Sequence, residues 1–100
     1  MLYRMRIYRA VPANLAAFHE FFREYLLPTQ LRHGARLVGR WQTEDHRVVA
    51  VWEYDDRRAY ERTDAAVRAD PATQQAQARR ERLPTLFTAV EETFMSSTIT

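Results

Sequence analysis

The sequence predicts an α+β fold in which a split βαβ unit forms an antiparallel sheet with helices on one face. Two observations predict it. Segments with strand-like and helix-like periodicity follow one another in the order strand, helix, strand, strand, helix, short helix, strand. In addition, 46% hydrophobic and 28% charged residues in a chain of 100 describe one compact domain, which we expect to span residues 1–100.

The first strand and the first helix are predicted by a change in hydrophobic period. Residues 2–9 alternate between two kinds of side chain, as in a half-buried strand. Asn14 is placed to cap a helix that begins at Leu15, and Pro28 is expected to limit that helix. The apolar residues between them recur at steps of three and four, which gathers them on one helix face: Leu15, Phe18, Phe22, Tyr25 and Leu26.

A β-hairpin is predicted in the middle of the chain. Gly34 closes a short loop before a strand over residues 35–43, and a polar turn leads into an apolar, β-rich strand over residues 47–54. Gly39 within the first of these strands indicates a bulge or a close approach of another group.

Two further helices and a last strand complete the predicted fold. Asp55 or Asp56 can cap the second helix. The dipeptide Asp70-Pro71 ends that helix and favours the start of a third over residues 72–83. Residues 85–95 are typical of a strand.

The two faces of the first strand differ in a way that bears on assembly. An apolar face carries Tyr3, Met5 and Ile7, and an arginine face carries Arg4, Arg6 and Tyr8. If the helices cover the apolar face, the arginine face looks into an interior between two sheets. A short chain has a thin core, and packing two such sheets across a two-fold axis predicts a homodimer with the architecture of a dimeric α+β barrel.

Missing residue types exclude several kinds of chemistry. Without cysteine there is no disulfide, thiolate nucleophile or cysteine-based zinc site. All 15 basic residues are arginine, which excludes lysine Schiff-base chemistry and a P-loop lysine. Gly34 and Gly39 are the only glycines and cannot form a glycine-rich phosphate loop, and the three histidines have no metal-ligand spacing. We therefore expect no metal and no cofactor.

Charge and hydropathy indicate neither a nucleic acid nor a membrane partner. A net charge of +2 with thirteen acidic residues interspersed is too small to favour nucleic acid. The longest apolar run, Val48 to Trp52, is far short of a membrane span, and the first residues contain no apolar signal-peptide core. We expect a cytoplasmic protein.

Short motifs along nearly the whole chain resemble those of the NIPSNAP family. They are Arg6-x-Tyr8, His33-Gly34-x-x-Leu37-Val38-Gly39-x-Trp41, Trp52-x-Tyr54-Asp55 and Asp70-Pro71. The resemblance implies a ferredoxin-like domain that dimerises through its sheets and is related to small antibiotic-type monooxygenases, muconolactone isomerases and EthD-like proteins. It leaves the reaction open, because the biochemical activity of the family is mostly undefined.

His33 and Arg6 are the candidate catalytic residues. A histidine can act as a general acid or base near neutral pH, and His33 precedes the glycine that opens the second strand. The alternative for His33 is a helix exit in which the imidazole bonds a terminal carbonyl.

Arginine inside a protein requires a partner for its charge. For Arg4 and Arg6 this partner is either an internal carboxylate, with Glu53, Glu91 and Glu92 as candidates, or an anionic or phenolate ligand. The candidate ligand-binding residues are Arg4, Tyr8, Trp41, Trp52 and Tyr54, and the aromatic ones could equally fill the core.

These expectations favour a cofactor-independent enzyme that acts on a small aromatic or polyketide-like molecule in the barrel interior, by isomerase- or cyclase-type proton transfer or by monooxygenation. Its ligand would be apolar or aromatic with an anionic group. The alternative is a non-catalytic ligand-binding or protein-interaction module, in which the arginines are paired internally and His33 is a cap. A cavity open to solvent would favour the enzyme, whereas a filled interior would favour the non-catalytic module.

Overall fold

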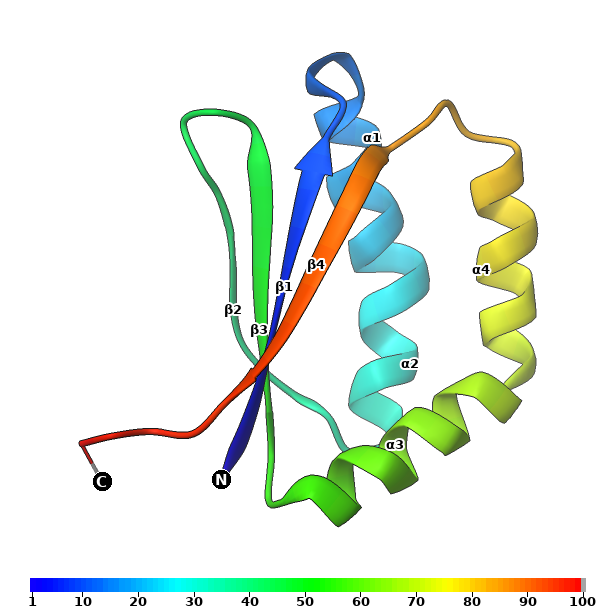
Figure 1. The fold of residues 1–100 in the computed structure, drawn as a ribbon. Coiled ribbons are helices and arrows are strands. Elements are labelled where there is room, and N and C mark those ends of the chain that lie inside the picture. The colour runs from blue at the N-terminus through cyan, green and yellow to red at the C-terminus, as the bar shows by residue number, and fades with distance from the viewer. Residues whose placement is uncertain (100) are drawn as a thin grey trace.

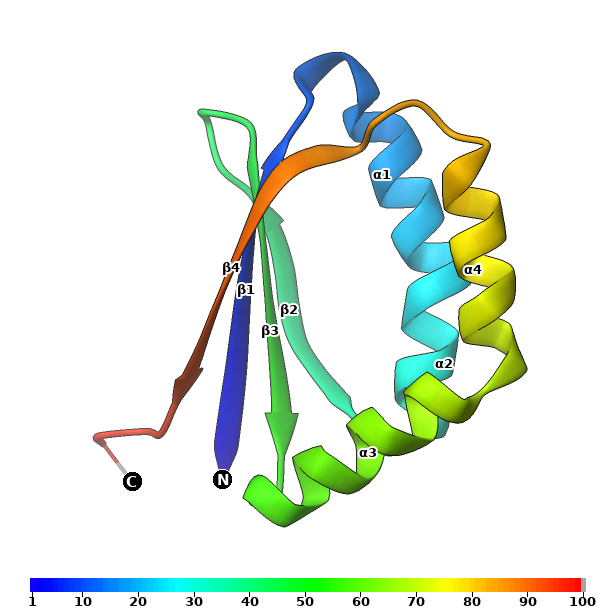
Figure 2. The same ribbon diagram turned by 45° about the vertical axis from the view of Figure 1, so that its right-hand side comes forward.

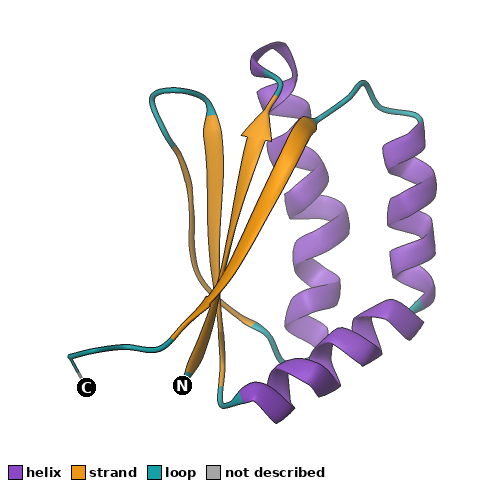
Figure 3. Ribbon diagram, viewed as in Figure 1, coloured by secondary structure: helices purple, strands orange, loops and turns teal. Residues whose placement is uncertain are grey.

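The computed structural model describes residues 1–99 as one antiparallel sheet and a series of helices (Figures 1 and 3). In chain order the elements are β1 (Leu2–Ala10), the 3-10 turn η1 (Pro12–Asn14), α1 (Leu15–Phe21), the π-helical segment η2 (Phe22–Leu26), α2 (Leu27–Arg32), β2 (Arg36–Gln42), β3 (Arg47–Tyr54), α3 (Arg57–Ala69), α4 (Pro71–Glu81) and β4 (Phe87–Met95). The strands lie in the order β2-β3-β1-β4. This confirms the predicted α+β fold with its split βαβ arrangement.

The helices cover one face of the sheet and leave the other open (Figure 2). In β3 every second side chain, from Val48 to Tyr54, is buried, and those between are partly or fully exposed. Cross-strand partners share a face, and the arginine face of β1 pairs with the buried residues of β3. The helices therefore cover the arginine face, and the expectation that they cover the apolar face is wrong.

Aromatic rings explain why arginine is tolerated beneath the helices. The guanidinium carbon of Arg4 lies 5.4 Å from the ring centre of Tyr60 on α3, and that of Arg6 lies 5.4 Å from the ring centre of Tyr8. A guanidinium is planar and weakly hydrated, so it stacks on aromatic faces at a small desolvation cost. Alternation in the sequence shows that the two faces differ, but it does not show which face meets the helices.

The core lies between the sheet and the helices in two clusters. One is built around Phe18, Phe21 and Val48, beneath α1 and α4. The other is built around Trp52 and Tyr54, with side chains of η2, α2 and α3 packed against it.

The first helix continues through Pro28 to Arg32, contrary to the expectation that Pro28 limits it. Proline has no N–H, and its ring conflicts with the carbonyl four residues earlier. The π-helical segment η2 lies directly before α2, in which Pro28 occupies the first turn. The wider π-helical turn accommodates both the missing N–H and the proline ring. The longer helix brings His33 close to the junction of α3 and α4.

Two of the predicted helix caps are present and one is replaced. Asp56 accepts a hydrogen bond from the backbone N–H of Ala59 at 2.7 Å, which caps α3. Asp70 does the same for α4 through the N–H of Ala72 at 2.9 Å. Asn14 makes no capping bond, because its side-chain amide donates to the carbonyl of Thr85 at 2.7 Å and ties η1 to the segment before β4.

Gly39 marks the predicted irregularity in β2. The pairing with β3 shifts register between Leu37 and Gly39, and a Cβ atom on Gly39 would stand 2.3 Å from the ring of Trp41. The indole therefore lies against the glycine on the open face of the sheet. There Trp41 is 52% exposed.

Candidate functional site

The candidate site is a cavity of about 200 Å³ between the arginine face and the helices. Four of its ten lining residues are aromatic. The ring centres of Tyr8 and Phe18 are 5.2 Å apart, those of Tyr8 and Phe87 are 4.9 Å apart, and both pairs meet edge to face. The cavity is lined by Arg6 and Tyr8 of β1, Phe18 and Phe21 of α1, Leu26 of η2, Thr73, Ala76, Gln77 and Arg80 of α4, and Phe87 of β4.

Two guanidinium groups reach this aromatic cavity. Arg80 comes from α4, and its guanidinium lies 4.4 Å from the ring centre of Phe87. Arg6 comes from the sheet, and its Nε is buried without a hydrogen-bond partner. The nearest carboxylate oxygen to that atom belongs to Glu92, at 3.9 Å, which is too long for a hydrogen bond. Arg6 therefore keeps donor capacity at the wall of the cavity.

Glu92 serves chiefly as the partner of Arg4. The Nε of Arg4 donates to the Glu92 carboxylate, and Arg4 is only 7% exposed. Burial disfavours the charged form of Arg4, but hydrogen bonds to Glu92 and Tyr54 outweigh burial and raise the pKa of Arg4. Of the two partners considered for this arginine, the internal carboxylate is the one observed.

Arg40 of β2 is a third cation on the helix-facing side of the sheet. Its guanidinium lies 4.9 Å from the ring centre of Phe18 and 4.3 Å from that of Phe22. Nη1 hydrogen-bonds Nδ1 of His19 at 2.7 Å, while Nε and Nη2 are buried without partners. Burial lowers the pKa of Arg40 to about 10, so the group stays charged at neutral pH.

The interior beneath the helices therefore carries excess positive charge. Arg4, Arg6 and Arg40 all project from this sheet face, and Glu92 is the carboxylate that pairs with two of them within the described residues 1–99. A desolvated cation with unpaired donors is costly unless an anion meets it. Of these three arginines, Arg6 lines the aromatic cavity and could donate to an anion there.

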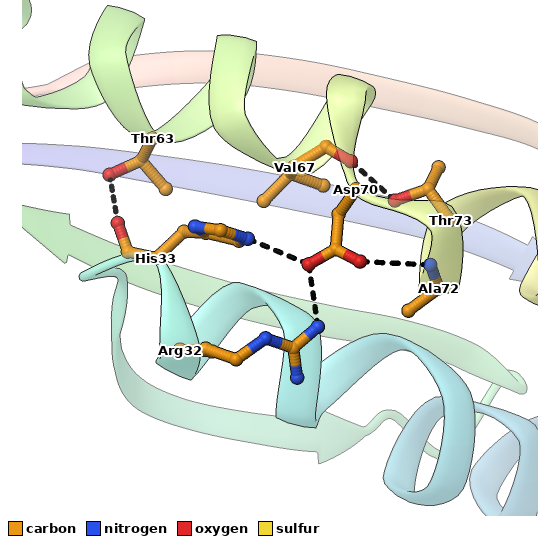
Figure 4. A network of polar contacts seen from close by, with 7 residues as sticks. All are labelled: Arg32, His33, Thr63, Val67, Asp70, Ala72 and Thr73. Carbon is orange, nitrogen blue, oxygen red and sulfur yellow. Dashed lines mark hydrogen bonds and ion pairs between the residues drawn. The ribbon is translucent and has the colours of Figure 1, made fainter.

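His33 lies in a different place, at the junction of α2, α3 and α4 (Figure 4). Its Nε2 is 2.8 Å from Oδ2 of Asp70, which also accepts from Arg32 at 2.6 Å. The carbonyl of His33 accepts from the Thr63 hydroxyl at 2.8 Å. Through the Asp70 carboxylate, the imidazole thus links the end of α2 to the junction of α3 and α4. The helix cap considered from the sequence differs, because there the imidazole bonds a terminal carbonyl.

A second hollow lies beside His33. It has a volume of about 360 Å³, and polar groups form much of its wall, among them Arg36, Asp55 and Arg62. His33 and Tyr54 line this hollow, whereas Arg6 and Tyr8 line the aromatic cavity. The two candidate catalytic residues are therefore not brought together.

The remaining predicted ligand-binding residues are divided between the two faces of the sheet. Trp52 and Tyr54 are buried on the helix side as part of the core, with Trp52 next to Phe22 and Tyr54 next to Tyr60. Trp41 lies on the open face. None of the three lines the aromatic cavity.

Sequence reasoning missed Arg40 and Arg80 as components of the site. Arg40 follows Gly39 in a strand whose bulge changes the alternation, so its face could not be assigned from parity alone. Arg80 belongs to a basic cluster that resembles a solvated helix face. The only signal for Arg80 was its spacing of four residues from Ala76, which lies on the buried side of α4.

Residues 1–99 contain neither a membrane-spanning helix nor a metal-binding cluster. No helix in that range has the length and apolar character needed to cross a bilayer. No three of its histidine, aspartate and glutamate side chains come together in a way that could hold a metal ion.

The sequence matches the family model described as NIPSNAP over residues 3–98. Among proteins with curated descriptions, none matches the chain.

Several solved structures resemble the fold. A NIPSNAP domain protein from Burkholderia xenovorans aligns with a TM-score of 0.85 and 25% identity over 99% of this chain and 96% of that one. A protein from Agrobacterium tumefaciens aligns with a TM-score of 0.86 and 20% identity over 99% and 95% of the two chains. A Streptomyces coelicolor monooxygenase, solved with the ligand nanaomycin D, aligns with a TM-score of 0.71 and 17% identity over 96% and 86%. The fold is thus similar to that of dimeric α+β barrel monooxygenases.

We predict that Arg4 and Arg6 differ in their contribution to stability. Arg4→Ala removes a buried cation and its bond to Glu92, so the free energy of unfolding should fall by roughly 2 to 4 kcal/mol. Arg6→Ala removes a longer and more exposed contact and should cost about 1 kcal/mol or less. Urea denaturation measures both, and a double-mutant cycle with Glu92→Gln isolates the Arg4 pair. Equal losses for the two arginines would contradict this assignment.

We also predict that Asp70 makes stability depend on pH at the acidic end. Hydrogen bonds from Arg32, the Ala72 N–H and His33 hold the pKa of Asp70 well below its usual range. As the pH falls, the carboxyl of Asp70 therefore binds a proton at a higher pH in the unfolded chain than in the folded one. The stabilisation by ionised Asp70 is complete above about pH 4 and is lost as the pH falls further.

Asp70→Asn should lower the melting temperature at pH 7, and its difference from the native protein should shrink from pH 5 towards pH 2. Melting curves across that range measure this difference. Asp55→Asn, at an exposed carboxylate, is the control. A difference between Asp70→Asn and the native protein that stays constant with pH would refute the linkage.

Proposed function

The chain belongs to the NIPSNAP family, and from that premise we propose that it is a homodimeric, cofactor-independent enzyme for a small aromatic or polyketide-like molecule. The reaction is proton transfer of the isomerase or cyclase type, or monooxygenation with dioxygen as co-substrate. The ligand binds in the aromatic cavity, which lies between the sheet and its own helices. The sequence predicted a ligand in the interior between two sheets, which is the opposite side of the sheet.

One observation supports this proposal above the others. The aromatic cavity combines rings that meet edge to face with two guanidinium groups, and one of these, Arg6, has a buried Nε without a partner. Rings of Tyr8, Phe18 and Phe87 offer faces and edges to a planar ligand, while Arg6 and Arg80 offer donors to a carboxylate, phenolate or enolate. Positive charge held in place beside a ligand stabilises negative charge that develops during a reaction.

The structural comparisons support a small-molecule ligand. The Streptomyces monooxygenase was solved with nanaomycin D, and its chain shares this fold at 17% identity. Similarity at that level carries the architecture and not the site, so the ligand class for this protein rests on its own cavity.

A non-catalytic ligand-binding module is the second candidate. The pairing of Arg4 with Glu92 and of His33 with Asp70 favours it, because both contacts stabilise the fold without a ligand. Such a module would bind aromatic anions without changing them. An enzyme would also catalyse proton exchange in a bound compound that can enolise.

The homodimer is proposed from the open face of the sheet. Met5, Ile7, Val49 and Val51 lie there as a half-buried apolar surface with no helix over it, and Trp41 stands at its side. A contiguous apolar surface of this kind is uncommon on a monomer. Two such sheets packed face to face would bury both surfaces and leave each aromatic cavity beneath its own helices.

We predict that the aromatic cavity prefers aromatic anions. 1-Naphthoate should bind more tightly than the neutral 1-naphthamide, since only the carboxylate carries a charge that can form ion pairs with both guanidinium groups. Arg80→Gln and Arg6→Gln should each weaken naphthoate binding about ten- to a hundredfold and leave naphthamide binding nearly unchanged. Titration calorimetry measures the affinities of both compounds for the native protein and for each variant.

Arg82→Gln is the matched control, since it removes the same charge two residues further along the chain and outside the cavity lining. The proposed cavity is wrong if neither compound binds, or if Arg82→Gln weakens naphthoate as much as Arg80→Gln.

We predict a dimer by sedimentation equilibrium at micromolar concentration. Val51→Glu places a charge in the centre of the apolar open face, so it should shift the species to monomer and lower the melting temperature. Ala65→Glu adds the same charge on an exposed position of α3 and should leave the dimer intact. A monomeric native protein, or a Val51→Glu variant that stays dimeric, would contradict the proposed interface.

A further inference from the structure

An enzyme that works by proton transfer needs a group that exchanges protons at its ligand. The lining of the aromatic cavity contains no histidine, aspartate or glutamate. The guanidinium group of an arginine is not a proton donor in protein catalysis, which leaves out Arg6 and Arg80. Among the residues that line this cavity, Tyr8 is the remaining side chain with a titratable proton.

Tyr8 is held firmly in the cavity wall. Its ring is wedged between Phe18 and Phe87, with ring centres at 5.2 and 4.9 Å and interplanar angles of 76° and 68°. Both contacts are between aromatic rings, so they restrict the orientation of the Tyr8 ring. A phenol fixed in this way is preorganised to meet a bound ligand.

Two cations stand near Tyr8 on the same sheet face. Arg6 lies two residues earlier on β1, with its guanidinium 5.4 Å from the Tyr8 ring centre. Arg40 lies two strands away, opposite Ala50, which is itself opposite Arg6. The small Ala50 leaves room between the two guanidinium groups, and Arg40 and Tyr8 both pack against Phe18.

We infer that Tyr8 is the catalytic acid of the aromatic cavity, which protonates carbon in a bound aromatic enolate; this inference rests on the proposed function. The Oη–H bond of Tyr8 breaks and a C–H bond forms at the ligand carbon. The electron pair for the new bond comes from the C=C bond of the enolate, whose C–O⁻ becomes C=O. The Tyr8 phenolate then takes a proton from water. Where the ligand begins as the enol, its hydroxyl first gives its proton to water to form the enolate, so protons balance and the step needs no oxidant or reductant.

Two neighbouring arginines support the assignment of Tyr8 as the acid. Negative charge moves during the step from the enolate oxygen to the oxygen of Tyr8. Arg6, which lines the cavity, and Arg40, which packs on Phe18 behind it, place fixed positive charge around both positions. The unpaired Nε of Arg6, which lines the cavity, is a donor that this charge would satisfy.

Phenylpyruvate is the probe for this assignment, because it is aromatic, carries a carboxylate and enolises. Ketonisation of its enol is followed by the loss of ultraviolet absorbance, and exchange of its benzylic hydrogens with D₂O is followed by NMR. The native protein should accelerate both. Tyr8→Phe should lower both rates by about 10² to 10⁴ while phenylpyruvate affinity changes by less than about threefold.

Two controls accompany Tyr8→Phe. Tyr3→Phe removes a hydroxyl from the same strand on the open face and should keep the native rates. His33→Gln tests the residue selected from sequence, and if Tyr8 is the acid this variant should also keep the native rates.

The outcomes separate this inference from the proposed function. If phenylpyruvate and naphthoate bind but the native protein accelerates neither reaction, the ligand site stands and the role of Tyr8 is overturned. The role is also overturned if Tyr8→Phe retains the rates, and their loss in His33→Gln instead would assign the acid to His33. If neither compound binds, the proposed function fails and this inference fails with it. Loss of rate in Tyr8→Phe alone, with binding retained, supports it.

Discussion

The helices of this protein rest on a sheet face that carries three arginines, and the accommodation of that charge shapes the rest of the structure. Arg4 is neutralised by Glu92, whereas Arg40 packs against the rings of Phe18 and Phe22 and hydrogen-bonds an imidazole nitrogen of His19. A core built in this way needs aromatic rings rather than aliphatic side chains, because rings can face a cation. The concentration of phenylalanine in α1 and η2 follows from this need.

The same constraint explains why the interior is not completely filled. Guanidinium groups are rigid and must keep their donors near partners, so they cannot close a gap as leucine or methionine would. Between Arg6, Arg80 and the rings of Tyr8 and Phe87, a cavity of about 200 Å³ remains. Unpaired donors at its wall represent a cost in the empty protein that an anionic ligand would offset. This links the stability of the fold to the chemistry proposed for the cavity.

Asp70 joins helices at the place where α2, α3 and α4 meet. One carboxylate caps α4, bonds Arg32 at the end of α2 and holds His33, so the three helices meet at a single group (Figure 4). The continuation of the first helix through Pro28 makes this contact possible, because it carries Arg32 and His33 to the junction. The position of α4, and with it of Arg80 and the far wall of the aromatic cavity, depends on this joint.

The sequence by itself determined the element order, the sheet and most of the boundaries, because these depend on local periodicity and on caps such as Asp56 and Asp70. It also identified Arg6 and Tyr8 as residues of one face and singled out His33. It could not determine which face of β1 meets the helices, since alternation is symmetric with respect to the two sides of a sheet. It could not show that Pro28 lies within a helix, because a π-helical turn depends on packing.

Only the tertiary structure decided that Arg6 and Tyr8 share a cavity with Arg80, while His33 lies apart with Asp70. Those groups come from β1, α4 and the end of α2. Their distances are set by how the helices pack on the sheet, and spacing along the chain does not encode them.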